Sequence, residues 1–309
     1  MDDGYALLRA IEADPDEDTP RLAYADWLDE HAATDADRAR AEFIRVQCEL
    51  ARVATDDERR AALNVREREA VAPWCSVWAD QLPVKLSGMR FERGFFTPLR
   101  FDAADWFRAA DGIAALAPLI ELELRSSTNP VRKDAARSCP ALQLVRRLNA
   151  SGRRLVTSLV RVGRLQNLFA LDVSASDLDS DECESLAATS FPNLRRLAMT
   201  RNLIADRGLE ALRHAAWFGQ LESLALDHCG VSDGSLVAFV SHPHAANLRR
   251  LTLGPFANSD EVARALIASP HLSRIDSLHL RHDGTSEQMR TELGVRFAGN
   301  VVIHSLRLG

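Results

Sequence analysis

Three aspartates near the start of the chain have the spacing of a calcium-binding loop. Asp14, Asp16 and Asp18 alternate along the sequence, as the first carboxylate ligands of an EF-hand do. That loop also requires Gly at its sixth position and Glu at its twelfth. Counting from Asp14, these positions hold Thr19 and Ala25. We therefore interpret the triplet as a solvated turn that precedes a helix.

Other residues could do chemistry, but their spacing does not support it. His242 and His244 could bind a metal, yet no spacing such as H-E-x-x-H is present. Asp26 and Glu30 lie one turn apart on a predicted helix, but no nucleophile or third group accompanies them. The sequence also contains no phosphate-binding loop, no G-x-S-x-G and no dinucleotide fingerprint. We expect no metal, no cofactor and no enzymatic activity.

Composition narrows the class of protein. The five cysteines are odd in number and widely spaced, which favours reduced, buried thiols. No run of 18 apolar residues is present and the N-terminus is acidic, so we expect a cytoplasmic protein that neither enters a membrane nor carries a secretory signal. Residues 1–60 hold 17 Asp and Glu against 8 Lys and Arg. This acidic head would repel phosphates, which argues against nucleic acid as a partner.

An internal repeat dominates the rest of the chain. The pattern L-x-x-L-x-L returns every 23 to 28 residues. Its apolar positions are Phe96/Leu99/Phe101, Leu119/Leu122/Leu124, Val145/Leu148/Ala150, Leu168/Leu171/Val173, Leu194/Leu197/Met199, Leu221/Leu224/Leu226, Leu248/Leu251/Leu253, Ile275/Leu278/Leu280 and Ile303/Leu306/Leu308. Repetition with this period predicts an α/β leucine-rich repeat solenoid. We expect a parallel sheet on the concave side and helices on the convex side.

A small all-α domain is predicted before the solenoid. Residues 1–82 show helical patterns, with Thr19 as an N-cap and Pro73 as a helix stop. Residues 83–309 are assigned to the solenoid, which begins with a β-hairpin cap. Trp74, Trp78 and Trp106 are expected to pack at this junction. Asp206 is expected to accept bonds from free N–H groups at the start of a helix.

Two resemblances to known families add to this reading. Residues 118–309 resemble leucine-rich repeats of the ribonuclease-inhibitor type, whose pattern L-x-x-L-x-L-x-x-N-x-I-x-D-x-G is nearly complete in 194–208. Residues 7–30, together with AEFIRVQ at 41–47, resemble the bacterial repeat-companion domain. That domain stands at the N-terminus of bacterial repeat proteins, and the resemblance implies no known activity.

The side chains between the core leucines are the candidate binding residues. The residues we assign to protein binding are Arg147, Arg196, Arg250, Arg281, Asp172 and Asp227. The first three fall in one lateral row and suit recognition of carboxylates, because the guanidinium group matches carboxylate geometry. We predict a non-enzymatic protein-binding module that uses the concave face. The alternatives are a solvated face without a partner, a structural or assembly scaffold whose acidic helical head is the binding element, and an enzyme with a site at the head–solenoid junction.

Overall fold

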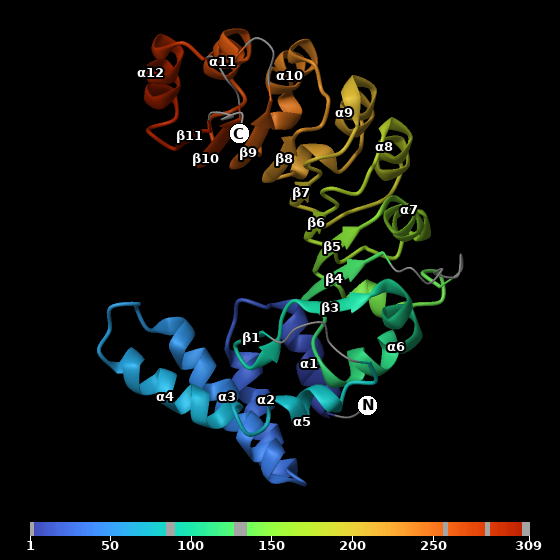
Figure 1. Ribbon diagram of the computed structural model, residues 1–309, viewed down its shortest axis with the longest axis vertical. Helices are drawn as coiled ribbons and strands as arrows, with labels where there is room; N and C mark the ends of the chain where they lie inside the picture. Colours follow the sequence, from blue (N-terminus) through green and yellow to red (C-terminus); the bar gives the residue numbers. More distant parts are fainter. Residues whose placement is uncertain (1–2, 85–89, 127–134, 256–258, 282–284, 305–309) are drawn as a thin grey trace, which may run out of the picture. The chain divides into compact units, whose positions relative to one another are not determined.

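The fold was established from a computed structural model, which describes residues 3–84, 90–126, 135–255, 259–281 and 285–304 (Figure 1). The chain divides into two compact units, residues 1–147 and 148–309. The sequence-based boundary after residue 82 divides the chain by element type, whereas these units reflect packing. The helical head therefore forms one unit with the hairpin and the first repeat strands.

The first unit contains five helices followed by the start of the repeats. Its elements are α1 (Asp3–Ala13), α2 (Thr19–His31), α3 (Asp35–Arg52), α4 (Arg59–Val71), α5 (Cys75–Asp80), β1 (Phe91–Glu92), β2 (Phe95–Phe96), β3 (Leu99–Asp102), α6 (Ala103–Leu116), β4 (Glu121–Arg125) and the 3-10 helix η1 (Pro140–Leu144). Strands β1 and β2 form the predicted antiparallel hairpin. Helix α4 ends at Val71, just before Pro73.

Helix α3 packs against α1, α2 and the hairpin. It begins with a capping box, in which Thr34 and Asp37 satisfy each other's backbone N–H groups. Its buried side is continuous with the hairpin, because Ile44 and Phe95 belong to one apolar cluster with residues of α1 and α2. Gly94 has φ +88°, and a Cβ there would overlap Ile44. The hairpin can approach α3 this closely only because residue 94 has no side chain.

The tryptophans predicted at the junction occupy separate places within the first unit. Trp78 is buried beside Phe43, and its Nε1 donates a 3.0 Å hydrogen bond to the Ala36 carbonyl. Trp106 is fully buried and packs against Phe101. Trp74 is only half-buried. Two of the three therefore contribute large buried side chains to this unit.

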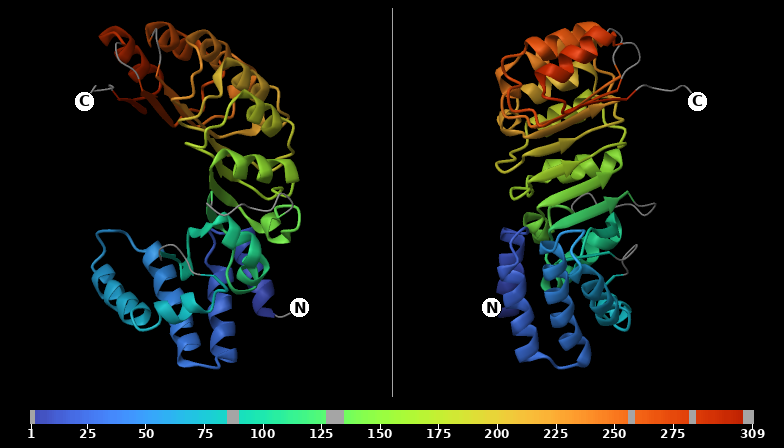
Figure 2. Two further views of the ribbon diagram at one scale, coloured as in Figure 1. Left: turned by 45° about the vertical axis from the view of Figure 1, so that its right-hand side comes forward. Right: turned by 90° about the vertical axis from the view of Figure 1, so that its left-hand side faces the viewer.

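The second unit alternates strands with helices. Its elements are β5 (Arg147–Ser151), whose first residue closes the first unit, α7 (Arg153–Val162), β6 (Ala170–Asp172), α8 (Ser180–Ala187), β7 (Arg196–Ala198), α9 (Ala205–Arg213), η2 (Phe218–Gln220), β8 (Ser223–Asp227), α10 (Asp233–Val240), η3 (Pro243–Ala245), β9 (Arg250–Gly254), α11 (Ser259–Ala268), β10 (Ser277–Arg281), α12 (Glu287–Arg296) and β11 (Val301–His304). Within this unit the helices stack along one side of the strands (Figure 2).

Among the described residues, the sheet has nine strands in chain order, from β3 to β11. The L-x-x-L-x-L pattern of the sequence sets the register of the strands. Leu197 lies beside Leu224, and Leu224 lies beside Leu251, in parallel strands. Each of these leucines is buried. The chain therefore folds as a leucine-rich-repeat-type α/β solenoid, as the periodicity predicts.

Buried polar groups tie neighbouring repeats together. The amide of Asn202 accepts hydrogen bonds from the N–H groups of Ser176 and Leu178 and donates to the carbonyls of Val173 and Met199. In the next repeat Cys229 takes this position, and its thiol donates to the Met199 carbonyl at 3.1 Å. These bonds satisfy turn backbone that is shielded from water.

Asp206 acts on the next helix rather than on its own. Its carboxylate accepts hydrogen bonds from the N–H and hydroxyl of Ser232, which is the N-cap of α10. Asp260 does the same for the N–H of Ser286, the N-cap of α12. The aspartate therefore links successive repeats, while a serine caps the helix.

The predicted register of the last repeat is wrong. Val301 and Ile303 lie beside Leu278 and Leu280, where the pattern predicts Leu306 and Leu308. The turn after α12 is short, because Ala298 and Gly299 both adopt positive φ and bring the chain back early. Ser305 and Arg307, expected on the same face, lie outside the described residues.

Candidate functional site

The exposed strand face of the second unit is formed by the side chains that alternate with the core leucines. We define it by Ala170, Asp172, Arg196, Ala198, Ser223, Ala225, Arg250, Thr252, Ser277 and His279. Because strand side chains point alternately to opposite sides, these residues lie on the side of the sheet opposite the buried leucines. Most of them are small, so the face presents much backbone and little bulk.

Arg196 and Arg250 lie in one lateral row of this face. Arg196 pairs in register with Ser223, and Ser223 pairs with Arg250. The two arginine positions are therefore two strand spacings apart, about 10 Å. Ala170 continues the row on one side and Ser277 on the other.

The two arginines differ in their surroundings. The guanidinium group of Arg196 lies 5.1 Å from the ring centroid of Phe169, a cation–π contact that holds a half-buried side chain. Arg250 is exposed, and its guanidinium group forms no ion pair or hydrogen bond with any residue that the structure describes. Arg250 is thus the member of the row that can most readily bind an external carboxylate.

Arg147 belongs to the first unit and has a partner there. Its guanidinium group lies 3.7 Å from the carboxylate of Glu121 on β4. Both side chains are partly exposed, so this pair contributes little to stability. Glu121 nevertheless offsets the positive charge that the sequence assigns to Arg147.

Asp227 and Arg281 pair with each other. Asp227, at the end of β8, is buried, and its Oδ2 lies 3.1 Å from the Nε of Arg281, at the end of β10. Gly254 of β9 lies beside Asp227 in register, and a Cβ on it would overlap Arg281. The absence of a side chain at residue 254 lets the backbone of Arg281 approach β9 closely. Both predicted binding residues are therefore used within the sheet.

Asp172 is held by a local bond. Its Oδ1 accepts a 2.9 Å hydrogen bond from the Ser174 N–H, a turn that aspartate commonly stabilises. The predicted set therefore divides into one exposed cation, Arg250, one stacked cation, Arg196, and four residues with local partners. The sequence spacing predicted the row of arginines but not these local contacts. Phe169 and Gly254, which take part in them, carry no charge and belong to no motif.

Two of the acidic residues that suggested calcium or acid–base chemistry, Asp18 and Asp26, form ion pairs. Asp18 is buried, and its Oδ2 lies 2.7 Å from the Nε of Arg52, whereas Asp14 and Asp16 are exposed. Asp26 pairs with Arg45 at 2.7 Å rather than acting with Glu30. Across the described residues, no group of three or more His, Cys, Asp or Glu is placed to hold a metal ion.

The cysteine thiols of the core are not activated. Burial raises the pKa of Cys183 to about 12 and that of Cys229 to about 11. Nucleophilic cysteines instead have a lowered pKa. None of the five cysteines forms a disulfide; Cys75 is half-buried and the other four are buried. In the described part of the chain, no helix has the length and apolar content needed to cross a membrane.

Comparison with known proteins gives no family assignment. No family model matches the chain, and no curated protein matches it. Among solved structures, the chain is similar to leiomodin-1 actin-binding site 2, with a TM-score of 0.32, 11% identity and coverage of 56% of this chain and 91% of that one. An internalin from Listeria monocytogenes has a TM-score of 0.34 and 15% identity, covering 67% of this chain and 66% of that one. At these values, the fold assignment rests on the strand order and register described above.

Proposed function

We propose that this protein is a non-enzymatic protein-binding module whose exposed strand face takes up an acidic surface of its partner. The observation that carries the proposal is the row of Arg196 and Arg250 with Ser223 between them. Small neighbours such as Ala198 and Ala225 leave the guanidinium groups accessible to a protruding carboxylate. Solenoids commonly bind proteins through such extended surfaces.

The proposal also assigns the repeats to the ribonuclease-inhibitor type and the head to a repeat-companion domain, as the two sequence resemblances imply. An α-helix follows each strand from β5 to β10, which agrees with repeats of the ribonuclease-inhibitor type. The head carries the AEFIRVQ segment on α3, and the resemblance of this segment to a repeat-companion domain supports that part of the proposal. In this view the head accompanies the repeats, and the strand face selects the partner.

A capture experiment with matched charge reversals tests the proposal. The full chain is used as bait in three forms: wild type, Arg250→Glu and Arg264→Glu. Arg264 is an exposed residue of α11 on the helix side, so its reversal changes net charge equally. Proteins retained by wild type and Arg264→Glu but lost with Arg250→Glu support the strand face. Equal retention by all three baits contradicts it.

The alternative places binding on the acidic head. Asp14, Asp16 and Glu30 are exposed there. If Arg250→Glu retains every partner, a bait with these three carboxylates changed to Asn, Asn and Gln tests this alternative. Loss of partners from that bait assigns binding to the head and leaves the solenoid as a scaffold.

A further inference from the structure

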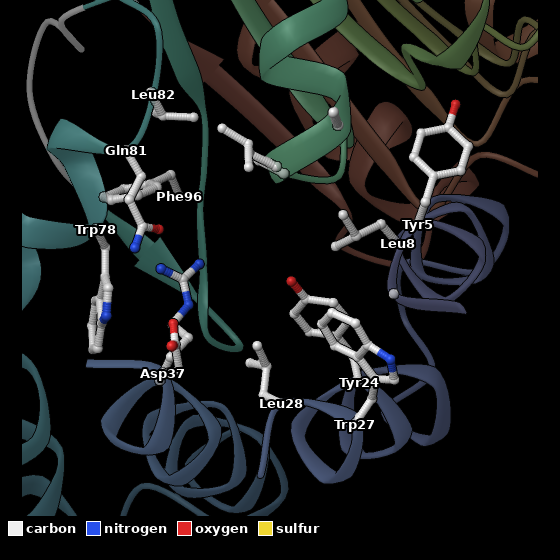
Figure 3. A pocket seen from close by; sticks show the side chains of 15 residues that line it. Tyr5, Leu8, Tyr24, Trp27, Leu28, Asp37, Trp78, Gln81, Leu82 and Phe96 are labelled. Atoms are coloured by element: carbon white, nitrogen blue, oxygen red, sulfur yellow. The ribbon is translucent and has the colours of Figure 1, made fainter. Parts of the chain in front are cut away.

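A cavity of about 320 Å³ lies within the first unit. Its walls come from α1, α2, α3, α5, β2 and the end of α6 (Figure 3). The residues that line it are Gly4, Tyr5, Leu8, Tyr24, Trp27, Leu28, Asp37, Arg40, Trp78, Gln81, Leu82, Phe96, Ala115, Leu116 and Ala117. This volume is typical of a site for a small organic molecule.

Arg40 brings a positive charge to this largely aromatic and aliphatic cavity. Its guanidinium carbon lies 5.0 Å from the ring centroid of Trp78, 5.4 Å from that of Phe95 and 5.5 Å from that of Phe96. The rings hold the group by cation–π contacts. These rings offer no hydrogen-bond acceptor to the N–H groups of the guanidinium.

No anion of the described protein compensates this charge. Arg40 forms no ion pair with a described residue, and its Nε is buried without a hydrogen-bond partner. Asp37 also lines the cavity, but its Oδ2 accepts bonds from Ala33 and Thr34 as part of the helix cap. Burial lowers the pKa of Arg40 to about 10, so the group remains cationic at neutral pH.

Arg40 is half-buried. A cation partly withdrawn from water without an anion is costly, and this cost is recovered when a carboxylate binds it. We propose that the cavity is a binding site for a small organic monocarboxylate with an apolar body, whose carboxylate pairs with Arg40. The apolar body would lie between the wall of Tyr24 and Trp27 and the wall of Trp78 and Phe96, which face the same space in Figure 3. This proposal is independent of the strand face.

A monocarboxylate fits better than a phosphate. The cavity lining contains one arginine and no lysine, whereas residues 1–60 carry more than twice as many acidic as basic residues. A doubly charged group would meet this repulsion with a single cation to bind it. A planar carboxylate can use two parallel N–H donors of one guanidinium.

Direct binding to the full chain tests the proposal. The probes are 3-phenylpropanoate and its uncharged amide, and calorimetry together with the intrinsic tryptophan fluorescence of the chain gives the affinity. We expect the acid to bind about tenfold or more tightly than the amide, because a charge-assisted bond is lost. Phenyl phosphate is expected to bind more weakly than the acid.

A second experiment with peptides distinguishes a peptide C-terminus from a free organic acid as the natural carboxylate. A Gly-Gly-Gly-Phe peptide is compared with the same peptide carrying a C-terminal amide. Binding of the free acid form as well as 3-phenylpropanoate assigns the site to chain ends, whereas binding of 3-phenylpropanoate alone assigns it to free acids. Either result supports a carboxylate site.

Variants on α3 separate the site from general effects. Arg40→Met is expected to lower the affinity for 3-phenylpropanoate about tenfold or more, while Arg38→Met, at an exposed residue of the same helix, leaves it unchanged. If Arg40→Met does not fold, Arg40→Lys is used, which keeps the charge and loses the planar donor pair. No binding of either acid by the wild-type chain, or equal affinity for acid and amide, overturns the proposal.

Discussion

The carboxylate of Glu12 accepts a 2.5 Å hydrogen bond from the backbone N–H of Leu119. Glu12 lies on α1 and Leu119 just before β4, so the bond joins the helical head to the first repeats within one unit. The carboxylate is 4% exposed. Its other partner is Arg9, 3.1 Å away, which also donates to the Ala114 carbonyl.

Burial of Glu12 makes stability depend on pH. Burial raises the pKa of Glu12 from 4.5 to about 7, and the Leu119 N–H and Arg9 oppose the shift. The folded state therefore binds a proton more tightly than the unfolded state between these values. The free energy of unfolding should fall as pH rises from about 4.5 to 7, by about 3 kcal/mol at most.

Glu12→Gln should remove this dependence, because the amide keeps an acceptor for Leu119 and does not titrate. Urea denaturation at pH 5 and pH 8 measures the effect. The difference in the free energy of unfolding between wild type and Glu12→Gln should change between the two pH values. Relative to wild type, the variant should be more stable at pH 8 than at pH 5. Glu17→Gln, at an exposed carboxyl, serves as the control and should follow the wild type. Parallel profiles for Glu12→Gln and wild type would contradict this account.

Asn202 should be important for the stability of its repeat. Asn202→Ala leaves the N–H groups of Ser176 and Leu178 and the Val173 carbonyl without this partner, and each such loss costs about 1–3 kcal/mol. The Met199 carbonyl keeps its bond from the Cys229 thiol. Asn202→Cys should cost less than Asn202→Ala, because the thiol can keep a bond to the Val173 carbonyl of the preceding repeat, as Cys229 does to the Met199 carbonyl. Thermal and chemical denaturation give both values, and equal stability of the two variants would argue against the bonding pattern.

Leu224 tests the repeat register. It is 1% exposed on β8, so Leu224→Ala should lower the free energy of unfolding by about 2–5 kcal/mol. The damage should extend to adjoining repeats, because each repeat depends on its neighbours. Leu203→Ala is the matched control, since Leu203 is 74% exposed. If the two variants unfold alike, Leu224 is not in the core.

The periodicity of the leucines was sufficient to predict the solenoid and most of its register, because burial of one strand side fixes which residues face inward. It failed at Val301, where a short turn rather than the repeat length sets the strand. The pairing of Asp227 with Arg281 could not be read from spacing, because the two residues come from strands on either side of β9. Arg40 was also missed: the rings around it come from segments far apart in the sequence.

Arg196 and Arg250 are the two residues that we propose bind the partner. Charge on an exposed face mainly sets association rate and selectivity, and salt screens it. Changing both residues to Glu should therefore weaken binding and alter its dependence on salt. Circular dichroism checks that the variant remains folded, and Arg264→Glu controls for net charge.

The most direct measurement is the affinity of the purified full chain for a partner captured with the wild-type bait, at low and moderate salt. We predict that the Arg196→Glu/Arg250→Glu variant binds about tenfold or more weakly than wild type at low salt, that the difference narrows as salt rises, and that Arg264→Glu matches wild type. Unchanged affinity and unchanged salt dependence in the double variant would contradict the exposed strand face as the binding surface.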